Sequence, residues 1–220
     1  MICVSLEVSN VSDVLKKLEN LSLAELRLDK ASLGQAEIKQ LFSLPVNLIA
    51  TCRPGFCSEE DREENLLQAI RCGAKYVDVE IESPAAFKQD IINLAREKGC
   101  LVILSYHNFE ETPPAIELNR MVRKCFREGA DIAKIACQVN SSQDIIALLS
   151  LYGLDEAAAG KIISLGMGEK GKITRVAGPL LGAPFTYACF EQGSETAEGQ
   201  LDRKSLGTIL NYFEGEIREK

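Results

Sequence analysis

The chain has 220 residues, of which 46% are hydrophobic and 26% are charged. This composition is typical of a globular protein with a substantial core. The formal net charge of −7 argues against nucleic acid or an anionic membrane as a partner, although a locally basic site could still bind a small anion.

In chain order, strand-like and helix-like segments alternate from end to end. The predicted strand–helix pairs span residues 2–8 and 11–21, 23–29 and 34–44, 46–53 and 63–73, 76–82 and 85–99, 100–107 and 115–129, 130–139 and 141–153, 161–168 and 174–182, and 185–192 and 203–220. The strands are apolar and rich in β-branched residues, as buried parallel strands are. Eight such units in this length predict a (β/α)8 barrel. No Pro/Ser-rich linker interrupts the pattern, so we expect one domain over residues 1–220.

Eight cysteines are spread along the chain, several of them in apolar runs, and none forms a Cys-x-x-Cys pair. The N-terminal stretch MICVSLEV resembles a strand and has no features of a targeting signal. This pattern indicates reduced, buried thiols and a cytoplasmic protein. There is one histidine, and the cysteine spacings match no common zinc site, so we expect no bound metal.

Polar residues gather where the predicted strands end, which is where the active site of a barrel lies. Residues two apart on a strand share a face, so several of these side chains can point into the barrel, where they must be paired. They are Glu25, Arg27, Asp29, Arg53, Asp78, Glu80, His107, Lys134, Met167, Arg175 and Gln192.

Lys134 stands alone in the apolar run GADIAKIACQV. One interpretation is a structural ion pair with an acidic neighbour such as Asp78 or Glu80. The other is a nucleophilic amine, because desolvation and nearby cations favour the neutral form of lysine, which can attack a carbonyl. The pattern alone leaves both open.

His107, in SYHNF, ends the strand before the one that carries Lys134. A lone histidine is more often a satisfied structural residue. Schiff-base chemistry, however, needs a proton shuttle, and histidine titrates near neutral pH. Beside an amine nucleophile, His107 is therefore the candidate acid and base.

Seven motifs occur in order: AELRLD, TCR, SYHNF, DIAKIA, SLGMGEKG, ITRVAG and TAEGQ. Together they resemble the type I 3-dehydroquinate dehydratase family of the shikimate pathway. The resemblance implies a (β/α)8 barrel, usually a homodimer, that uses no metal or organic cofactor. It also implies syn elimination of water from 3-dehydroquinate through an imine on a lysine.

Carried over motif by motif, the resemblance makes Lys134 the imine-forming residue and His107 the general acid and base. Arg175 would bind the substrate carboxylate together with Gln200, because a guanidinium can pair with a carboxylate through two hydrogen bonds. The remaining substrate-binding residues implied by the motifs are Ser5, Glu25, Arg27, Arg53 and Thr196.

Two features depart from the family pattern. The family usually has a glutamate four residues after the strand-3 arginine, where it helps to orient the histidine, and this chain has Cys57 there. Glu59 or Glu60 could take that role, or the role could be absent. Many members also have an N-terminal hairpin that covers the barrel bottom, and we expect this chain to lack it.

Two other functions remain open from the residues alone. A class I aldolase or transaldolase would also use a barrel lysine, and would usually need a phosphate site. A barrel without catalytic activity could serve as a binding module, since a fold does not determine function.

Overall fold

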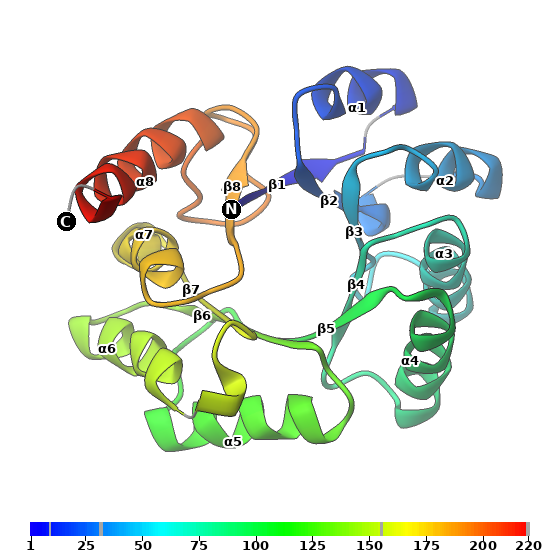
Figure 1. Cartoon of the computed structure of the whole chain (residues 1–220). Helices are drawn as coiled ribbons and strands as arrows, with labels where there is room; N and C mark the ends of the chain where they lie inside the picture. Colours follow the sequence, from blue (N-terminus) through cyan, green and yellow to red (C-terminus); the bar gives the residue numbers. More distant parts are fainter. Residues whose placement is uncertain (9, 31–32, 155, 219–220) are drawn as a thin grey trace. The chain divides into compact units, whose positions relative to one another are not determined.

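The computed structural model describes residues 1–8, 10–30, 33–154 and 156–218, and Figure 1 follows the chain through them. The strands are β1 (Ile2–Glu7), β2 (Leu23–Arg27), β3 (Asn47–Thr51), β4 (Tyr76–Glu80), β5 (Leu101–Asn108), β6 (Ile132–Gln138), β7 (Ile162–Met167) and β8 (Thr186–Cys189). The helices are α1 (Val11–Leu18), α2 (Gln35–Phe42), α3 (Glu59–Arg71), α4 (Ala85–Lys98), α5 (Ala115–Arg127), α6 (Ser142–Ser150), α7 (Lys172–Leu180) and α8 (Arg203–Arg218).

Strands and helices alternate along the described chain, and the strands form one sheet in the order β7-β6-β5-β4-β3-β2-β1-β8. From β1 to β7, strands that are consecutive in sequence are neighbours in the sheet, and β8 lies next to β1. This is the strand order of a (β/α)8 barrel, so the predicted fold class is confirmed.

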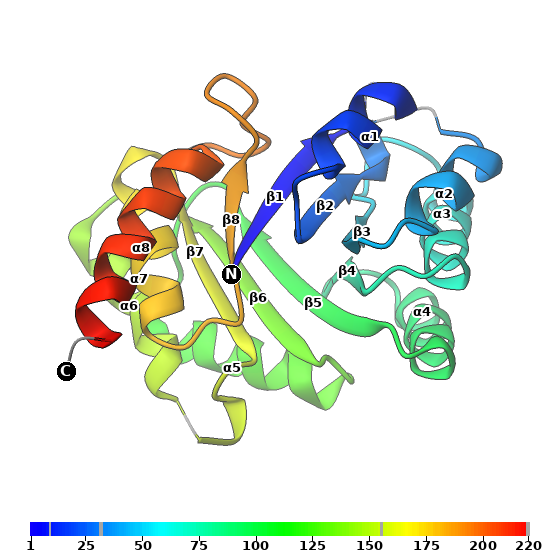
Figure 2. The same cartoon turned by 45° about the horizontal axis from the view of Figure 1, so that its top comes forward.

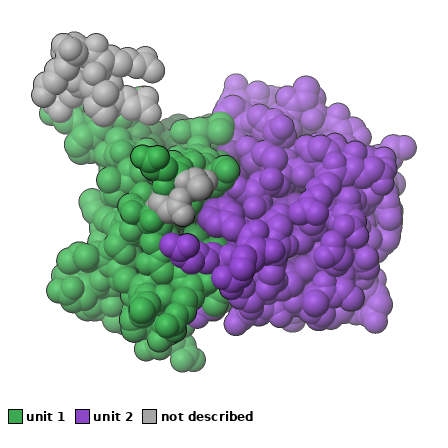
Figure 3. Space-filling view, turned by 60° about the horizontal axis from the view of Figure 1, so that its bottom comes forward, with its two compact units in different colours: residues 1–4, 107–122, 135–220 green, residues 5–106, 123–134 purple. Residues whose placement is uncertain are grey.

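Contacts within the chain gather in two compact units, coloured separately in Figure 3. Unit 1 consists of Met1–Val4, His107–Val122 and Ile135–Lys220, and unit 2 of Ser5–Tyr106 and Arg123–Lys134. The prediction of one domain over residues 1–220 is not tested by this division and stays a prediction.

In unit 2, β2, β3 and β4 are parallel neighbours, and α2, α3 and α4 follow one another along them (Figure 1). Their apolar side chains form a core in which Leu26, Ile49 and Val77 are completely buried. The register aligns Arg27 with Thr51 and Thr51 with Asp78. Polar residues of three strands therefore share one level of the sheet.

In unit 1, α7 packs against β7 and α6, an arrangement visible in Figure 2. A short 3-10 turn, Glu169–Gly171, joins β7 to α7. A Cβ atom on Gly171 would lie only 2.4 Å from the carbonyl carbon of Gly166. Glycine at residue 171 therefore allows the start of α7 to approach the end of β7 closely.

Several element boundaries differ from the predicted ones. Helix α3 begins at Glu59 instead of residue 63, because the Ser58 hydroxyl caps the amide of Asp61 and three acidic residues favour the helix N-terminus. Strand β3 ends at Thr51, which leaves Arg53 in the following loop. Strand β8 ends at Cys189, three residues before Gln192. Predicted helical residues 219 and 220 lie outside the described part of the chain.

Among the described residues, no helix has both the length and the apolar character needed to cross a bilayer.

Candidate active site

Lys134 lies on β6, whose first six residues are all buried. Its side chain is 5% exposed, and its Nζ lies 2.8 Å from Asp78 Oδ2 and 3.5 Å from Glu25 Oε1. Of the two acidic partners that the sequence suggested, the structure therefore pairs Lys134 with Asp78. Glu25 is the second carboxylate beside the Lys134 nitrogen. Both carboxylates thus lie within ion-pair distance of the lysine nitrogen.

Glu25 is buried on β2 and accepts hydrogen bonds from two hydroxyls. Ser5 Oγ donates at 2.6 Å and Thr51 Oγ1 donates at 3.0 Å. Burial opposes ionisation of this carboxyl and so does the charge of Asp78, but Lys134, Arg53 and the Ser5 hydroxyl together hold its pKa below the ordinary value. We therefore treat Glu25 as a carboxylate at neutral pH.

Arg53, in the loop after β3, uses its guanidinium to join three side chains. Nη1 donates to Asp78 Oδ1 at 3.0 Å, to Glu80 Oε1 at 2.7 Å and to Ser105 Oγ at 2.9 Å. Nη2 donates to Asp78 Oδ2 at 2.9 Å. Burial lowers the pKa of Arg53, but the neighbouring carboxylates of Asp78, Glu80 and Glu25 raise it by a larger amount. The net shift of the pKa is therefore upward. Arg53 is consequently a permanent cation bound within the protein.

Asp78 is the centre of this arrangement. Its side chain is completely buried and accepts from Arg53, from Lys134 and, at 2.6 Å, from the Ser105 hydroxyl. We call the set formed by Glu25, Arg53, Asp78, Glu80 and Lys134 the charged cluster. It contains three carboxylates and two cations, so ionised it has one negative charge in excess.

Arg27 and Asp29 form a separate pair at the end of β2. The guanidinium of Arg27 donates through Nε at 3.0 Å and through Nη2 at 2.7 Å to the two carboxylate oxygens of Asp29. Burial lowers the pKa of Arg27, yet the hydrogen bond and charge of Asp29 outweigh it and raise the pKa above its ordinary value. This bidentate geometry fixes the direction of Arg27.

Glu59 and Glu60, the two candidates for orienting His107, both lie in the first turn of α3. The Glu59 side chain is 50% exposed and accepts a hydrogen bond from Arg62 Nη1 at 2.9 Å. Buried Arg62 also donates to the Cys52 carbonyl and to the Ser83 hydroxyl, so Glu59 serves to pair this arginine. Glu60 is exposed. Whether either residue orients His107 stays an open prediction.

In unit 1, Arg175 lies one turn inside α7 and is 2% exposed. Its Nε donates to the Gly199 carbonyl at 2.9 Å and its Nη2 to the Glu198 carbonyl at 3.4 Å. Among the described residues no carboxylate forms an ion pair with it. Burial therefore lowers its pKa to about 10, which still leaves it charged at neutral pH. A buried cation without an anionic partner is suited to an anionic ligand.

The TAEGQ segment lies against the turn after β7. The Gly168 amide donates to the Glu198 carbonyl, and a Cβ atom on Gly199 would lie 2.3 Å from the Gly168 carbonyl oxygen. Within this segment, the Thr196 amide donates to Gln200 Oε1 at 2.8 Å, and Gln200 Nε2 donates to Thr196 Oγ1 at 3.2 Å. The segment thus brings Thr196 and Gln200 together and presents two carbonyls to Arg175.

His107 lies near the end of β5 and is half-buried. Its ring stacks on that of Phe109, with 6.1 Å between the ring centroids and 16° between the planes. Met167 is buried at the end of β7. Both therefore occupy strand ends, as predicted.

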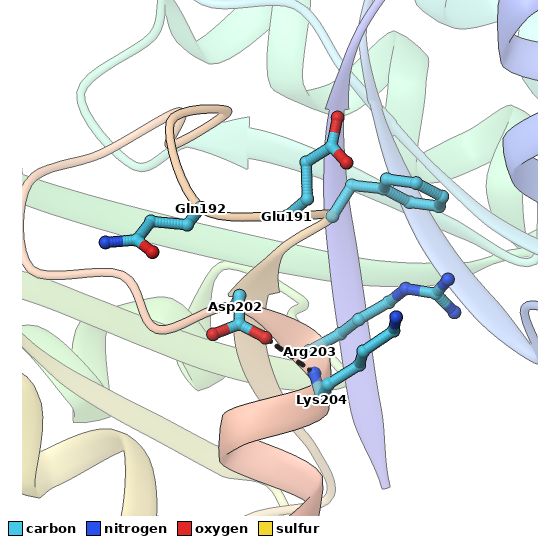
Figure 4. Close-up of a pocket in the computed structure, with 6 residues that line it drawn as sticks. Glu191, Gln192, Asp202, Arg203 and Lys204 are labelled. Atoms are coloured by element: carbon cyan, nitrogen blue, oxygen red, sulfur yellow. Dashed lines mark hydrogen bonds between the residues drawn. The ribbon is translucent and has the colours of Figure 1, made fainter.

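A cavity of about 250 Å³ lies between the end of β8 and the start of α8. Figure 4 shows its polar lining, which is formed by Glu191, Gln192, Asp202, Arg203 and Lys204. Asp202 caps α8 by accepting from the Lys204 amide, and the Arg203 guanidinium lies 4.4 Å from the centre of the Phe190 ring. Of the residues that line this cavity, only Gln192 belongs to the set of polar residues predicted at the strand ends. None of the lining residues is one that the family resemblance assigns to catalysis or substrate binding.

Sequence reasoning missed two members of the site, Thr51 and Ser105. Each hydroxyl donates to a carboxylate of the charged cluster. Both are completely buried polar residues on strands, and their strand positions are in register with Asp78 and Glu80 respectively. The sequence signal that could have identified them is a hydroxyl residue within an apolar strand that follows or precedes a strand with acidic residues.

The family model described as Type I 3-dehydroquinase matches residues 2–217. A 3-dehydroquinate dehydratase from Methanocaldococcus jannaschii is 32% identical over 225 residues, covering 97% of this chain and 99% of that protein. The crystal structure of the 3-dehydroquinate dehydratase from Aquifex aeolicus is similar with a TM-score of 0.82 and 30% identity, covering 97% of this chain and 98% of that one. The corresponding enzyme from Geobacillus kaustophilus gives a TM-score of 0.87 at 26% identity, covering 97% and 91%.

Proposed function

Because the chain belongs to the type I 3-dehydroquinase family, we propose that it converts 3-dehydroquinate to 3-dehydroshikimate through an imine on Lys134. The match over residues 2–217 is the observation that carries this proposal. The reaction removes the C1 hydroxyl and a C2 proton on the same face of the ring, as one molecule of water.

Lys134 supplies the nucleophile. Its ammonium must first lose a proton, and Asp78 accepts a hydrogen bond from it at 2.8 Å, closer than Glu25. The free amine attacks the C3 ketone, and loss of water gives an iminium ion. The carboxylates that hold the ammonium also stabilise this cation, because the positive charge stays on the same nitrogen.

His107 moves the protons in the next steps. The iminium withdraws electrons from C2, so an imidazole can remove the C2 proton. The resulting imidazolium can then protonate the C1 hydroxyl, which leaves as water. A second water hydrolyses the iminium, which returns the amine of Lys134 and releases the product.

Arg175 anchors the substrate carboxylate, assisted by Gln200 and Thr196. The lack of an acidic partner for this buried guanidinium among the described residues supports the role. A fixed anchor matters because rate depends on holding the reacting carbons in one geometry. Contacts with the ring hydroxyls are assigned to Ser5, Glu25, Arg27 and Arg53, following the family motifs.

We also propose that the protein acts in the cytoplasm as a homodimer, as the family resemblance implies. Sedimentation velocity at micromolar concentration tests the dimer, and a species with the mass of one chain would contradict it.

Borohydride trapping tests the imine. Incubation with 3-dehydroquinate and sodium borohydride should add the mass of the reduced substrate once, on the peptide that contains Lys134. Lys88 is a matched control, because it is also a buried lysine paired with a carboxylate, that of Glu128. Lys88→Met should still be labelled and Lys134→Met should not. Labelling of Lys134 by sugar phosphates, with none by 3-dehydroquinate, would support an aldolase instead.

A further inference from the structure

Two cysteines flank the loop that follows β3. The Sγ atoms of Cys52 and Cys57 are 3.9 Å apart. Cys52 is 1% exposed, whereas Cys57 is half-buried, and the intervening residues 54–56 are exposed.

We propose that Cys52 and Cys57 form a modification site, at which a peroxide oxidises the two thiols to a reversible disulfide. In the first step the Cys57 thiolate attacks the O–O bond, giving a sulfenic acid and hydroxide. In the second step the Cys52 sulfur displaces the sulfenic hydroxyl, forming the S–S bond, and its proton leaves with that hydroxyl as water. Two thiols thus give two electrons to one peroxide, which becomes two molecules of water.

The geometry fits this order of events. A disulfide bond is about 2.05 Å long, so the sulfurs must approach one another by about 2 Å. The loop between them contains Gly55 at a φ of 88°, and its neighbours are exposed, so few packing contacts oppose a movement of residues 54–57. Burial and the neighbouring Cys57 raise the pKa of Cys52, which keeps it a neutral thiol until the sulfenic acid forms. Cys57 is the more accessible of the two and therefore reacts first.

Oxidation would reach the active site through Arg53, which directly follows Cys52. Arg53 holds Asp78, Glu80 and Ser105, and Asp78 in turn holds Lys134. The Cys52 carbonyl also accepts a hydrogen bond from buried Arg62. A shift of Cys52 toward Cys57 would displace the guanidinium of Arg53. Because an active-site misplacement of 1 Å can reduce the rate by about 10²-fold, we expect kcat/KM to fall by roughly tenfold or more.

Mass spectrometry tests the disulfide without reference to activity. Trypsin leaves both cysteines in one peptide, residues 40–62, because the bond between Arg53 and Pro54 resists cleavage. After treatment with hydrogen peroxide and alkylation, this peptide should carry no alkyl groups and lack two hydrogens, and prior reduction should restore two alkyl groups. Two alkyl groups after peroxide, or an oxidised Cys57 beside an alkylated Cys52, would overturn the proposal.

Turnover tests the consequence, and this part depends on the proposed function. Each protein is compared with its own reduced form. The wild type and Cys72→Ser, which removes another half-buried thiol, should lose activity with peroxide and regain it with dithiothreitol. Cys57→Ser should keep its activity. Equal losses in Cys57→Ser and the wild type would contradict control by this pair. Absence of turnover before oxidation would refute the proposed function and leave the mass measurement valid.

Discussion

Replacing Lys134 with methionine removes one of the two cations of the charged cluster at nearly constant volume. Asp78, whose side chain is 0% exposed, loses an ammonium partner 2.8 Å from its Oδ2. Glu25, whose side chain is 5% exposed, loses the same partner 3.5 Å from its Oε1. Removing one member of a buried ion pair destabilises a protein by about 3–5 kcal/mol. For a chain of this length each kcal/mol lowers Tm by about 2–4 °C, so we expect a decrease of roughly 6–20 °C at pH 7.

The loss should depend on pH through Glu25. In the wild type, burial raises the pKa of Glu25 but Lys134 is the largest opposing influence. In Lys134→Met burial and Asp78 act with less opposition, so the pKa of Glu25 rises above its unfolded value near 4.5. A raised folded pKa stabilises the protonated form, so the stability deficit should shrink as pH falls from about 7 to about 5.

A second variant separates stability from chemistry. Lys134→Met with Glu25→Gln removes one carboxylate together with the cation. The glutamine oxygen can still accept from one of the Ser5 and Thr51 hydroxyls, and its NH2 group can donate to the other. Tm at pH 7 should recover in large part, while turnover stays absent because no amine is present. Lys88→Met is the control, and it should keep turnover at temperatures below its Tm.

Calorimetry at both pH values, together with ultraviolet detection of the conjugated product, provides the assay. A Tm for Lys134→Met that does not change between these pH values would refute the electrostatic reasoning. Turnover by the double variant would show that Lys134 serves only as an ion-pair partner.

Three further predictions concern other groups of the site. Arg175→Lys should raise KM and lower kcat/KM by about 10²-fold, because one ammonium cannot reproduce the two-point pairing of a guanidinium with a carboxylate. An unchanged kcat/KM for Arg175→Ala would exclude Arg175 as the anchor of the substrate carboxylate. His107→Asn should lose at least about 10²-fold in rate and accumulate a covalent adduct visible by whole-protein mass spectrometry. A loss of less than about threefold, far below that range, would place the base elsewhere. Because the pKa of Glu25 is lowered, its ionisation stabilises the fold above about pH 4.5 and less at lower pH, so Glu25→Gln should flatten the acid side of the Tm profile; parallel profiles would contradict this.

The fold class was predictable because it depends on patterns within short segments. Apolar runs separated by amphipathic helices specify parallel strands with crossovers, and eight such units in this length leave few alternatives to a barrel. The start of α3 was missed because its first turn has no apolar residues, so the hydrophobic pattern did not indicate a helix there. Ser58 and the acidic residues after it nevertheless stabilise the helix N-terminus.

The partners of the site residues could not be predicted in the same way. The sequence left Asp78 and Glu80 equally possible for Lys134, since both lie on one face of β4. In the structure Asp78 pairs with both Lys134 and Arg53, whereas Glu80 pairs with Arg53. Glu25 on β2 is the second carboxylate near Lys134. This choice depends on register between strands that are far apart in sequence, which no local pattern encodes.

Charge compensation distinguishes the roles of the two buried arginines. Arg53 has five N–H donors, and four hydrogen bonds join its guanidinium to Asp78, Glu80 and Ser105. Its charge is satisfied by the protein, so its main contribution is to hold Asp78, and thereby Lys134, in position. Arg175 has only carbonyl partners among the described residues, and burial without a counter-charge is unfavourable until an anion arrives. Under the proposed function, substrate binding therefore gains more from Arg175 than from Arg53, because the substrate carboxylate supplies the negative charge that Arg175 lacks within the protein.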